Sequence, residues 1–175
     1  MKLFKAISID FITDLPPSIN KVNNKKYNSI LVIVNRYTKL AQYIPYTKNI
    51  SAKALAKLFL YYWFKDQGLL ASIISNRGSV FTSKFWSTLC FYLKIRRGLL
   101  TAFYLQTDGQ TKRQNQAIKT WLRYYVCYIQ DDWANLLPLA KFVYNNTPYD
   151  LIKISLNKAR YRITLDTRQG IKDDS

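Results

Sequence analysis

One polar stretch decides how this chain folds, namely Thr107-Asp108-Gly109-Gln110-Thr111-Lys112-Arg113-Gln114-Asn115-Gln116. Two earlier segments belong with it, Ser75-Asn76-Arg77-Gly78-Ser79 and Ser8-Ile9-Asp10-Phe11-Ile12. Between Asn76 and Lys112 there are 35 residues. A lone aspartate on a strand or a single turn glycine fits many folds. Three such segments in one order carry more information than any one of them alone.

The composition excludes several classes of protein. With 175 residues, 49% of them hydrophobic, the chain is long enough for one domain with a real core. Its longest apolar run, Leu58 to Phe64, is far shorter than the roughly 20 residues of a membrane helix, so we expect no membrane partner. No signal-peptide pattern follows Met1. Cys90 and Cys127 have neither zinc nor disulfide spacing, and we expect buried free thiols.

The charge of the chain is strongly positive. The formal net charge is +17, from 27 basic and 10 acidic residues, which favours a polyanionic partner. All ten acids are aspartates, and the chain contains neither glutamate nor histidine. Because ordinary domains use glutamate heavily, its complete absence requires a cause of its own.

Hydrophobic periodicity predicts alternating strands and helices. Ile7, Ile9 and Phe11 fall on one face of the first strand and Asp10 on the other. Ser51 is a suitable N-cap and Gly68 a suitable residue after the C-terminus of the helix between them. The expected strands are 4–13, 27–37, 42–46, 71–75 and 95–101. The expected helices are 52–67, Ser83 to about Phe91, 111–129, and Asp131-Asp132 to about Tyr144. We expect Pro138 to bend the last of these helices or to delay its start.

The three segments resemble the active-site segments of retroviral-type integrases, specifically those of gypsy-type long-terminal-repeat retrotransposons. In that family each segment carries one carboxylate, with the second in S-D-R-G-S and the third in Q-T-D-G-Q-T-E-R at the same spacing. In this chain Asn76 and Lys112 occupy the second and third positions, and Asp10 alone keeps its carboxylate. The resemblance is therefore to a degenerate integrase catalytic core.

Further matches extend the resemblance over roughly Ala6 to Tyr149. They are Val34-Asn35-Arg36-Tyr37-Thr38-Lys39 against V-D-R-F-T-K, Phe81-Thr82-Ser83-Lys84-Phe85-Trp86 against F-T-S-x-F-W, Asp131-Asp132-Trp133, and Tyr144-Asn145-Asn146. The resemblance implies an α/β, RNase-H-like fold with a five-stranded mixed sheet flanked by helices. Residues 1–150 would form the catalytic core and residues 151–175 a basic, loosely packed tail.

The family's chemistry needs ligands that this chain lacks. Strand transfer is a phosphoryl transfer assisted by two Mg²⁺ or Mn²⁺ ions, which take oxygen ligands. Asn76 offers only a neutral amide oxygen, and Lys112 offers no acceptor. At 4 Å and an effective dielectric of about 20, the lysine charge repels a divalent ion by roughly 8 kcal/mol. We expect Asp10 to be the one remaining metal ligand, the site to bind no metal, and Lys112 to pair with Asp10.

A basic stripe on the expected long helix is the candidate nucleic-acid interface. Lys112, Lys119 and Arg123 recur at i, i+7 and i+11, with Gln116 among them. The resemblance implies that this helix face lies along the DNA end, whereas a solvated basic face is an equally good interpretation. Four tryptophans at helical spacing are expected in the core and not as base-stacking platforms: Trp63, Trp86, Trp121 and Trp133.

One mutational process accounts for the missing residue types. The family usually has Y-H-P-Q where this chain has Phe103-Tyr104-Leu105-Gln106. The changes of His to Tyr and of Pro to Leu are each one cytosine-to-thymine transition. Asp to Asn and Glu to Lys are the same transition on the opposite strand. Part of the +17 charge would then be mutational in origin. The base composition of the coding DNA tests this hypothesis.

Three functions remain open at this stage. The first is a catalytically inactive integrase core, a retrotransposon relic with residual affinity for DNA. The second is a co-opted nucleic-acid-binding or assembly module without catalysis, and the third is an active integrase with rearranged ligands. By resemblance the partners are retroelement ends and target DNA, with a possible homo-oligomer, and the location is nuclear.

Overall fold

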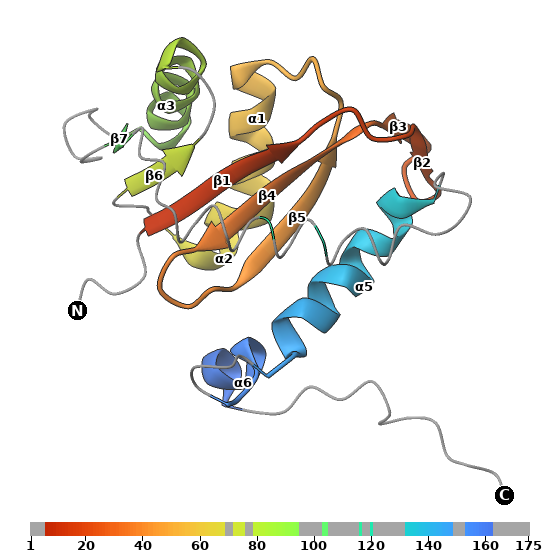
Figure 1. The fold of residues 1–175 in the computed structure, drawn as a ribbon. Helices are drawn as coiled ribbons and strands as arrows, with labels where there is room; N and C mark the ends of the chain where they lie inside the picture. The colour runs from red at the N-terminus through yellow and green to blue at the C-terminus, as the bar shows by residue number, and fades with distance from the viewer. Residues whose placement is uncertain are drawn as a thin grey trace, which may run out of the picture.

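The computed structural model describes residues 6–68, 72–75, 79–94, 103–104, 116, 120, 132–148 and 153–162. The elements within these ranges are β1 (Ala6–Ile12), β2 (Ser18–Asn20), β3 (Lys25–Tyr27), β4 (Ser29–Asn35), β5 (Ala41–Tyr46), α1 (Ala52–Phe59), the π-helical turn η1 (Leu60–Phe64), α2 (Lys65–Gln67), β6 (Ser72–Ser75), α3 (Ser79–Leu93), β7 (Phe103–Tyr104), α5 (Trp133–Asn146) and α6 (Leu156–Tyr161). Figure 1 shows their arrangement.

A five-stranded sheet in the order β5-β4-β1-β6-β7 forms the centre of the molecule. The pairs β1–β4 and β4–β5 are antiparallel, whereas β6 runs parallel to β1 and β7 runs parallel to β6. The sheet is therefore mixed, which confirms the expected five-stranded mixed sheet. A separate two-stranded hairpin, β2–β3, lies beyond the end of β1 (Figure 1).

Helices cover both faces of the sheet. On one face Leu55 and Phe59 of α1 and Phe85 of α3 form a buried cluster with strand residues such as Ile9. On the other face, Trp133, Leu137 and Ala140 of α5 form a second cluster with Ile30, Val32 and Val34. Alternate residues of β4 enter the two clusters, and all seven residues of β4 are buried. This explains the continuous β-branched run, which is typical of a strand covered on both faces.

The helical stretch over 52–67 agrees with the sequence prediction at both ends. The Ser51 hydroxyl oxygen accepts a hydrogen bond from the backbone N–H of Ala54, at 3.1 Å, as an N-cap should. Gly68 ends the helix with a φ of +74°, a conformation that suits glycine. The π-helical turn at Leu60–Phe64 was not predicted.

One of the two later predicted helix starts is wrong, and the other agrees with the structure. Helix α3 begins at Ser79, so Ser83 lies within the helix and does not cap it. Several residues before the apolar run could serve as N-caps, and the cap signal alone does not choose among them. Helix α5 begins at Trp133 with Asp132 as its N-cap residue, as predicted, and Pro138 lies inside the helix without delaying its start. Burial of Trp133 and Ala134 against the sheet fixes the first turn.

Several expected elements fall on residues outside the described ranges. They include the strand over 95–101 and most of the helix over 111–129, of which Gln116 and Thr120 are described, both as helical. The fifth strand of the sheet is Phe103–Tyr104. At the other end of the chain, α6 packs against α5 with Leu156 buried, while the division at residue 150 stays a prediction. Among the described helices, none has the length and apolar character needed to cross a bilayer.

Candidate functional site

Asp10 lies in the middle of the sheet, on the face covered by α5. Its cross-strand partner is Val32, whose side chain belongs to the α5 cluster, and directly paired residues project from the same face. Ile9 instead enters the cluster beneath α1 and α3. Asp10 is therefore on the opposite face from Ile7, Ile9 and Phe11, as the alternation predicted. Its exposed fraction is 5%, and its Oδ1 accepts a hydrogen bond from the backbone N–H of Phe11 at 2.9 Å.

The second site segment approaches the first through parallel pairing of β6 with β1. The register pairs Ile7 with Ile73, Ser8 with Ile74, and Ile9 with Ser75. Asp10 follows Ile9 in the chain, and Asn76 follows Ser75. The structure therefore brings the first two segments together up to the residue before each predicted ligand position.

The remaining predicted site residues fall largely outside the described ranges. Asn76, Lys112, Lys119 and Arg123 are not described, so their expected convergence and the expected Lys112–Asp10 pair stay predictions. Gln116 is helical and exposed. Exposure of this residue is compatible with both interpretations of the basic stripe.

The donor set does not suit the two ions of the family. Of the three ligand positions, Asp10 has a carboxylate, Asn76 a neutral amide and Lys112 a cation. One carboxylate leaves most of the charge of two divalent ions uncompensated. Within the described residues, no three His, Cys, Asp or Glu side chains lie close enough to form a metal-binding group.

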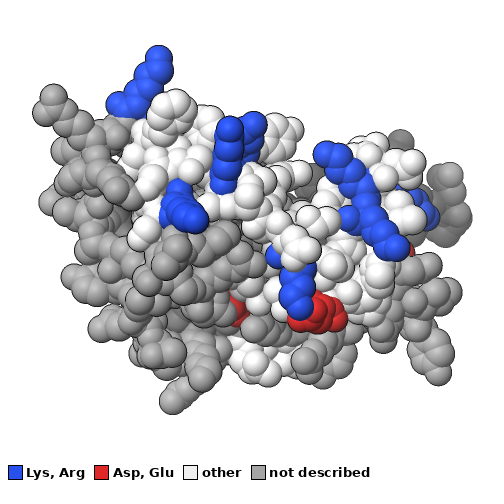
Figure 2. All heavy atoms as spheres, turned by 90° about the horizontal axis from the view of Figure 1, so that it is seen from above, with Lys and Arg blue, Asp and Glu red and all other residues white. Residues whose placement is uncertain are grey.

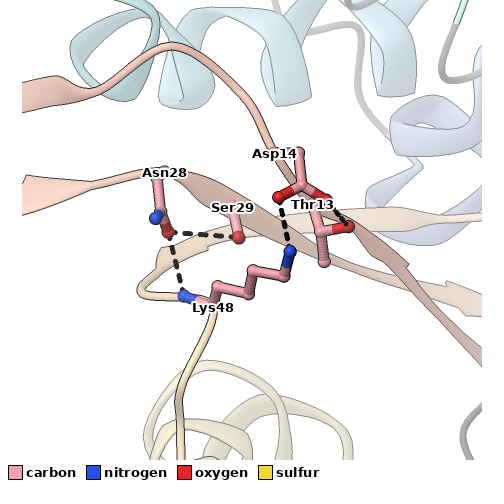
Figure 3. Close-up of polar contacts among 5 residues, drawn as sticks. All are labelled: Thr13, Asp14, Asn28, Ser29 and Lys48. Carbon is pink, nitrogen blue, oxygen red and sulfur yellow. Dashed lines mark hydrogen bonds and ion pairs between the residues drawn. The ribbon is translucent and has the colours of Figure 1, made fainter.

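Asp14, the other acid near the end of β1, is engaged in an ion pair that sequence reasoning missed. Lys48 Nζ lies 2.5 Å from Asp14 Oδ1, and the Thr13 hydroxyl donates to Asp14 Oδ2 at 3.0 Å; Figure 3 draws both contacts. The backbone N–H of Lys48 donates to Asn28 Oδ1 at 2.9 Å. The hydrogen bond from Lys48, followed by that from Thr13, lowers the pKa of the Asp14 carboxyl. Asp14 thus joins the end of β1 to Lys48 after β5, and does not add a free ligand near Asp10.

The other sequence motifs serve the scaffold. Asn35 Oδ1 accepts hydrogen bonds from the backbone N–H groups of Tyr37 and Thr38, at 2.9 and 3.0 Å, and so closes the turn after β4. Asn145 is buried and bonds both backbone groups of Ala41: Oδ1 accepts from the N–H and Nδ2 donates to the carbonyl, each at 3.0 Å. This pair joins α5 to the edge strand β5.

The tryptophan and cysteine predictions hold where the structure describes them. Trp63 and Trp133 are buried, and Trp86 is partly buried against the cluster beneath α1 and α3. Cys90 is a buried free thiol, as expected. Trp121 and Cys127 lie outside the described residues.

The comparisons with curated proteins lead to retrotransposons. The chain is 30% identical over 163 residues to the Transposon Tf2-3 and Tf2-4 polyproteins of Schizosaccharomyces pombe, a match that covers 85% of the chain. The chain spans only 11% of the length of these polyproteins. No protein-family model matches the chain.

Solved structures with the same fold are retroviral integrases. The similarity to a simian T-cell lymphotropic virus intasome has a TM-score of 0.63 and covers 94% of this chain and 57% of that one, at 17% identity. The chain has the integrase core fold. The catalytic core of bovine immunodeficiency virus (BIV) integrase matches with a TM-score of 0.60, over 90% of this chain and 93% of that one, at 17% identity.

The integrase core fold confirms the RNase-H-like architecture and the resemblance on which it was predicted. The chain is homologous to a segment of the Tf2 polyproteins and shares its fold with retroviral integrase cores. The catalytic core of HTLV-2 integrase matches with a TM-score of 0.55, over 94% of this chain and all of that one, at 17% identity. That core was solved with magnesium and in a trimeric form.

Proposed function

We propose that this chain is an integrase-type core that binds DNA and has lost metal-dependent strand transfer. The observation that carries the proposal is the placement of Asp10. It is buried on β1 beside the end of β6, where the next residue in the chain is Asn76. The strand pair β1–β6 leads to two of the three ligand positions, and only one of these two, Asp10, is a carboxylate.

Charge argues against two-metal catalysis at this place. Three carboxylates offset most of the four positive charges of two divalent ions, whereas Asp10, Asn76 and Lys112 together carry no net charge. The ions would remain uncompensated in a site where Asp10 is almost fully shielded from water, and electrostatic energies are larger in such surroundings. No step of strand transfer is therefore derived for this chain.

DNA binding is the part of the function that the remaining residues support. The net charge is +17, and the stripe of Lys112, Gln116, Lys119 and Arg123 offers a row of cations with one exposed amide at Gln116. The similar simian T-cell lymphotropic virus protein was solved in an intasome, and the HTLV-2 core in dimeric and trimeric forms. We extend to this chain a DNA partner, self-association and a nuclear location as parts of the proposal.

Reversion of the two ligand positions tests the loss of catalysis. The unaltered protein should neither cut nor join DNA with Mg²⁺ or Mn²⁺. Asn76→Asp combined with Lys112→Glu should restore Mn²⁺ binding in calorimetry, because three carboxylates would again face the ions. Asn76→Asp alone serves as the matched control and should not bind, since Lys112 still repels the metal.

Two results would contradict the proposal. One is metal-dependent joining by the unaltered protein at a rate close to that of the double revertant. The other is the absence of any salt-dependent affinity for duplex DNA in fluorescence anisotropy.

A further inference from the structure

The β2–β3 hairpin is a basic projection that the integrase site does not account for. Lys21, Lys25 and Lys26 are all exposed on it. The sequence contains no acid from residue 15 to residue 65, a stretch with nine lysines and arginines. Figure 2 shows Lys and Arg side chains spread over the face seen from above, including its right-hand side, where β2 and β3 lie in Figure 1.

The hairpin is fixed to the start of α5 by four hydrogen bonds between distant parts of the chain. The indole N–H of Trp133 donates to the Pro16 carbonyl at 2.7 Å, and the Ser18 hydroxyl accepts from the backbone N–H of Ala134 at 3.1 Å. Asn135 makes the other two. Its Oδ1 accepts from the backbone N–H of Lys21 at 2.8 Å, and its Nδ2 donates to the Ile19 carbonyl at 2.9 Å.

The tip of the hairpin is also held in place. Asn20 Oδ1 accepts hydrogen bonds from the backbone N–H groups of Val22 and Asn23, at 2.9 and 3.2 Å. Asn23 Oδ1 in turn accepts from the backbone N–H of Lys25 at 3.0 Å. Because the main chain is bonded on both sides of the turn, the lysines project from a fixed frame. A fixed frame lowers the entropy cost of binding a partner.

The environment of the three lysines suits a polyanion. Val22 at the tip is 93% exposed, so the projection is open to solvent. Among the residues that the structure describes, two acids lie on neighbouring parts of the molecule. Asp14 is paired with Lys48, and Asp132 is the partly buried N-cap residue of α5. Even if Asp132 offsets one lysine, the hairpin keeps a charge of about two, as expected for a surface that binds phosphates.

The position of the hairpin relates it to the integrase site. Strand β1, which carries Asp10, runs toward the hairpin, and β6 runs parallel to β1 (Figure 1). The hairpin therefore extends from the end of the sheet at which both site segments continue. A duplex lying across this end of the sheet would meet the lysines.

We propose that the β2–β3 hairpin is a second contact surface for the phosphate backbone of duplex DNA, separate from the stripe on the 111–129 segment. The inference rests on the proposed DNA-binding function and names a further surface for it. The contact should not depend on the DNA sequence, because lysines that bind phosphates make no contact with the edges of the bases.

Removal of the hairpin charges tests the inference. The hairpin variant is Lys21→Gln, Lys25→Gln and Lys26→Gln. The control variant is Lys57→Gln, Lys94→Gln and Lys158→Gln, which removes the same charge from exposed sites on α1, the end of α3 and α6. Binding to duplex DNA is measured by fluorescence anisotropy between 50 and 200 mM salt, and thermal melts verify that both variants fold.

The hairpin variant should bind at least about tenfold more weakly than the control variant at low salt. The slope of log affinity against log salt should become shallower by about 0.9 for each phosphate that the protein no longer neutralises. Equal affinities and slopes for the two variants would overturn the hairpin inference while leaving DNA binding intact. Absence of binding by the unaltered protein would overturn the proposed function itself, and the inference with it.

Lysine acetylation read by mass spectrometry provides a second test without any substitution. Duplex DNA should protect Lys21, Lys25 and Lys26 of the unaltered protein from the reagent, while Lys57, Lys94 and Lys158 stay reactive. Unchanged reactivity of the hairpin lysines at saturating DNA would overturn the inference.

Discussion

At the scale of single residues, Asp10 is the one carboxylate that remains at the three ligand positions. Its carboxylate is almost fully shielded from water, and its place in the family's pattern is that of a metal ligand. The backbone N–H of Phe11 donates a hydrogen bond to it. We expect the ammonium of Lys112, the residue at the third ligand position, to lie beside Asp10, in the place that a metal ion takes in the family.

A double-mutant cycle measures the expected pairing of Asp10 with Lys112. Asp10→Ala alone should destabilise the protein more than Asp10→Ala combined with Lys112→Met, because the single change leaves a lysine without its partner. The coupling should lie between about 0.5 and 3 kcal/mol in chemical denaturation. Lys94→Met, at an exposed site, is the control and should be additive with Asp10→Ala. A coupling energy of zero for Asp10 and Lys112 would contradict the pairing.

Lys141 is a residue whose positive charge is disfavoured by its surroundings. Burial lowers the pKa of its ammonium below the ordinary 10.5; Asp66 opposes the shift, whereas Arg160 and Lys65 add to it. The charged form is therefore less favourable in the folded than in the unfolded chain. The cost is present below the folded pKa and disappears as the pH rises from there to the unfolded value.

Comparison of the Lys141→Met variant with the unaltered protein should reveal this pH dependence. Near neutral pH the variant should be at least as stable as the unaltered protein. As the pH approaches 10.5, the stability of the unaltered protein should rise relative to that of the variant. Partial exposure of the side chain keeps the change below about 1 kcal/mol. Comparing urea midpoints of the two proteins at each pH cancels the titration of the tyrosines. A constant difference across this range would exclude the assigned cause.

At the scale of elements, Asn145 fastens α5 to the edge of the sheet. It satisfies both backbone groups of Ala41, which an edge strand would otherwise leave to water. Asn145→Ala should cost about 1–3 kcal/mol, because buried partners lose their hydrogen bonds. Asn145→Asp should cost at least as much, since a carboxylate oxygen would face the Ala41 carbonyl. Chemical denaturation of both variants measures these costs, and an Asp variant as stable as the unaltered protein would refute the assigned geometry.

The β2–β3 hairpin and helix α5 stabilise each other where they meet. Asp132 is the N-cap residue of α5 but makes no side-chain cap bond, and the hydroxyl of Ser18 on β2 takes the Ala134 N–H instead. The start of α5 is therefore capped by a residue 116 positions earlier in the chain. The same contact holds the basic hairpin in place, so the stability of α5 and the position of the lysines are linked.

At the scale of the whole molecule, residues after 150 contribute to the core region. Helix α6 packs against α5, Leu156 is buried, and the Arg160 guanidinium donates to the Asp66 carbonyl at the end of α2 at 3.3 Å. Basic side chains near a helix C-terminus interact favourably with its carbonyl groups. The last described helix thus contacts both α5 and the end of α2.

Truncation of one side chain tests whether α6 belongs to the folding unit. Leu156→Ala should lower the free energy of unfolding by about 2–4 kcal/mol, because a buried leucine leaves a cavity. Ile154→Ala, two residues earlier and 39% exposed, is the matched control and should cost less than about 1 kcal/mol. Equal, small effects would mean that α6 folds independently of the core, as a loosely packed tail would.

The sequence by itself determined those features that depend on neighbouring residues. Alternation placed Asp10 opposite Ile9, the Ser51 and Gly68 signals set the ends of the helical stretch over 52–67, and three spaced motifs led to the integrase core fold. Each of these follows from local geometry or from a pattern along the chain. The identity of the residues at the ligand positions also needed only the sequence, whereas their convergence stays a prediction.

Only the tertiary structure decided which distant side chains meet. The Asp14–Lys48 pair spans 34 residues, the Asn145 contact with Ala41 spans 104, and the Trp133 bond to Pro16 spans 117. Such contacts leave no period or spacing in the sequence, because the packing of the helices on the sheet selects the partners.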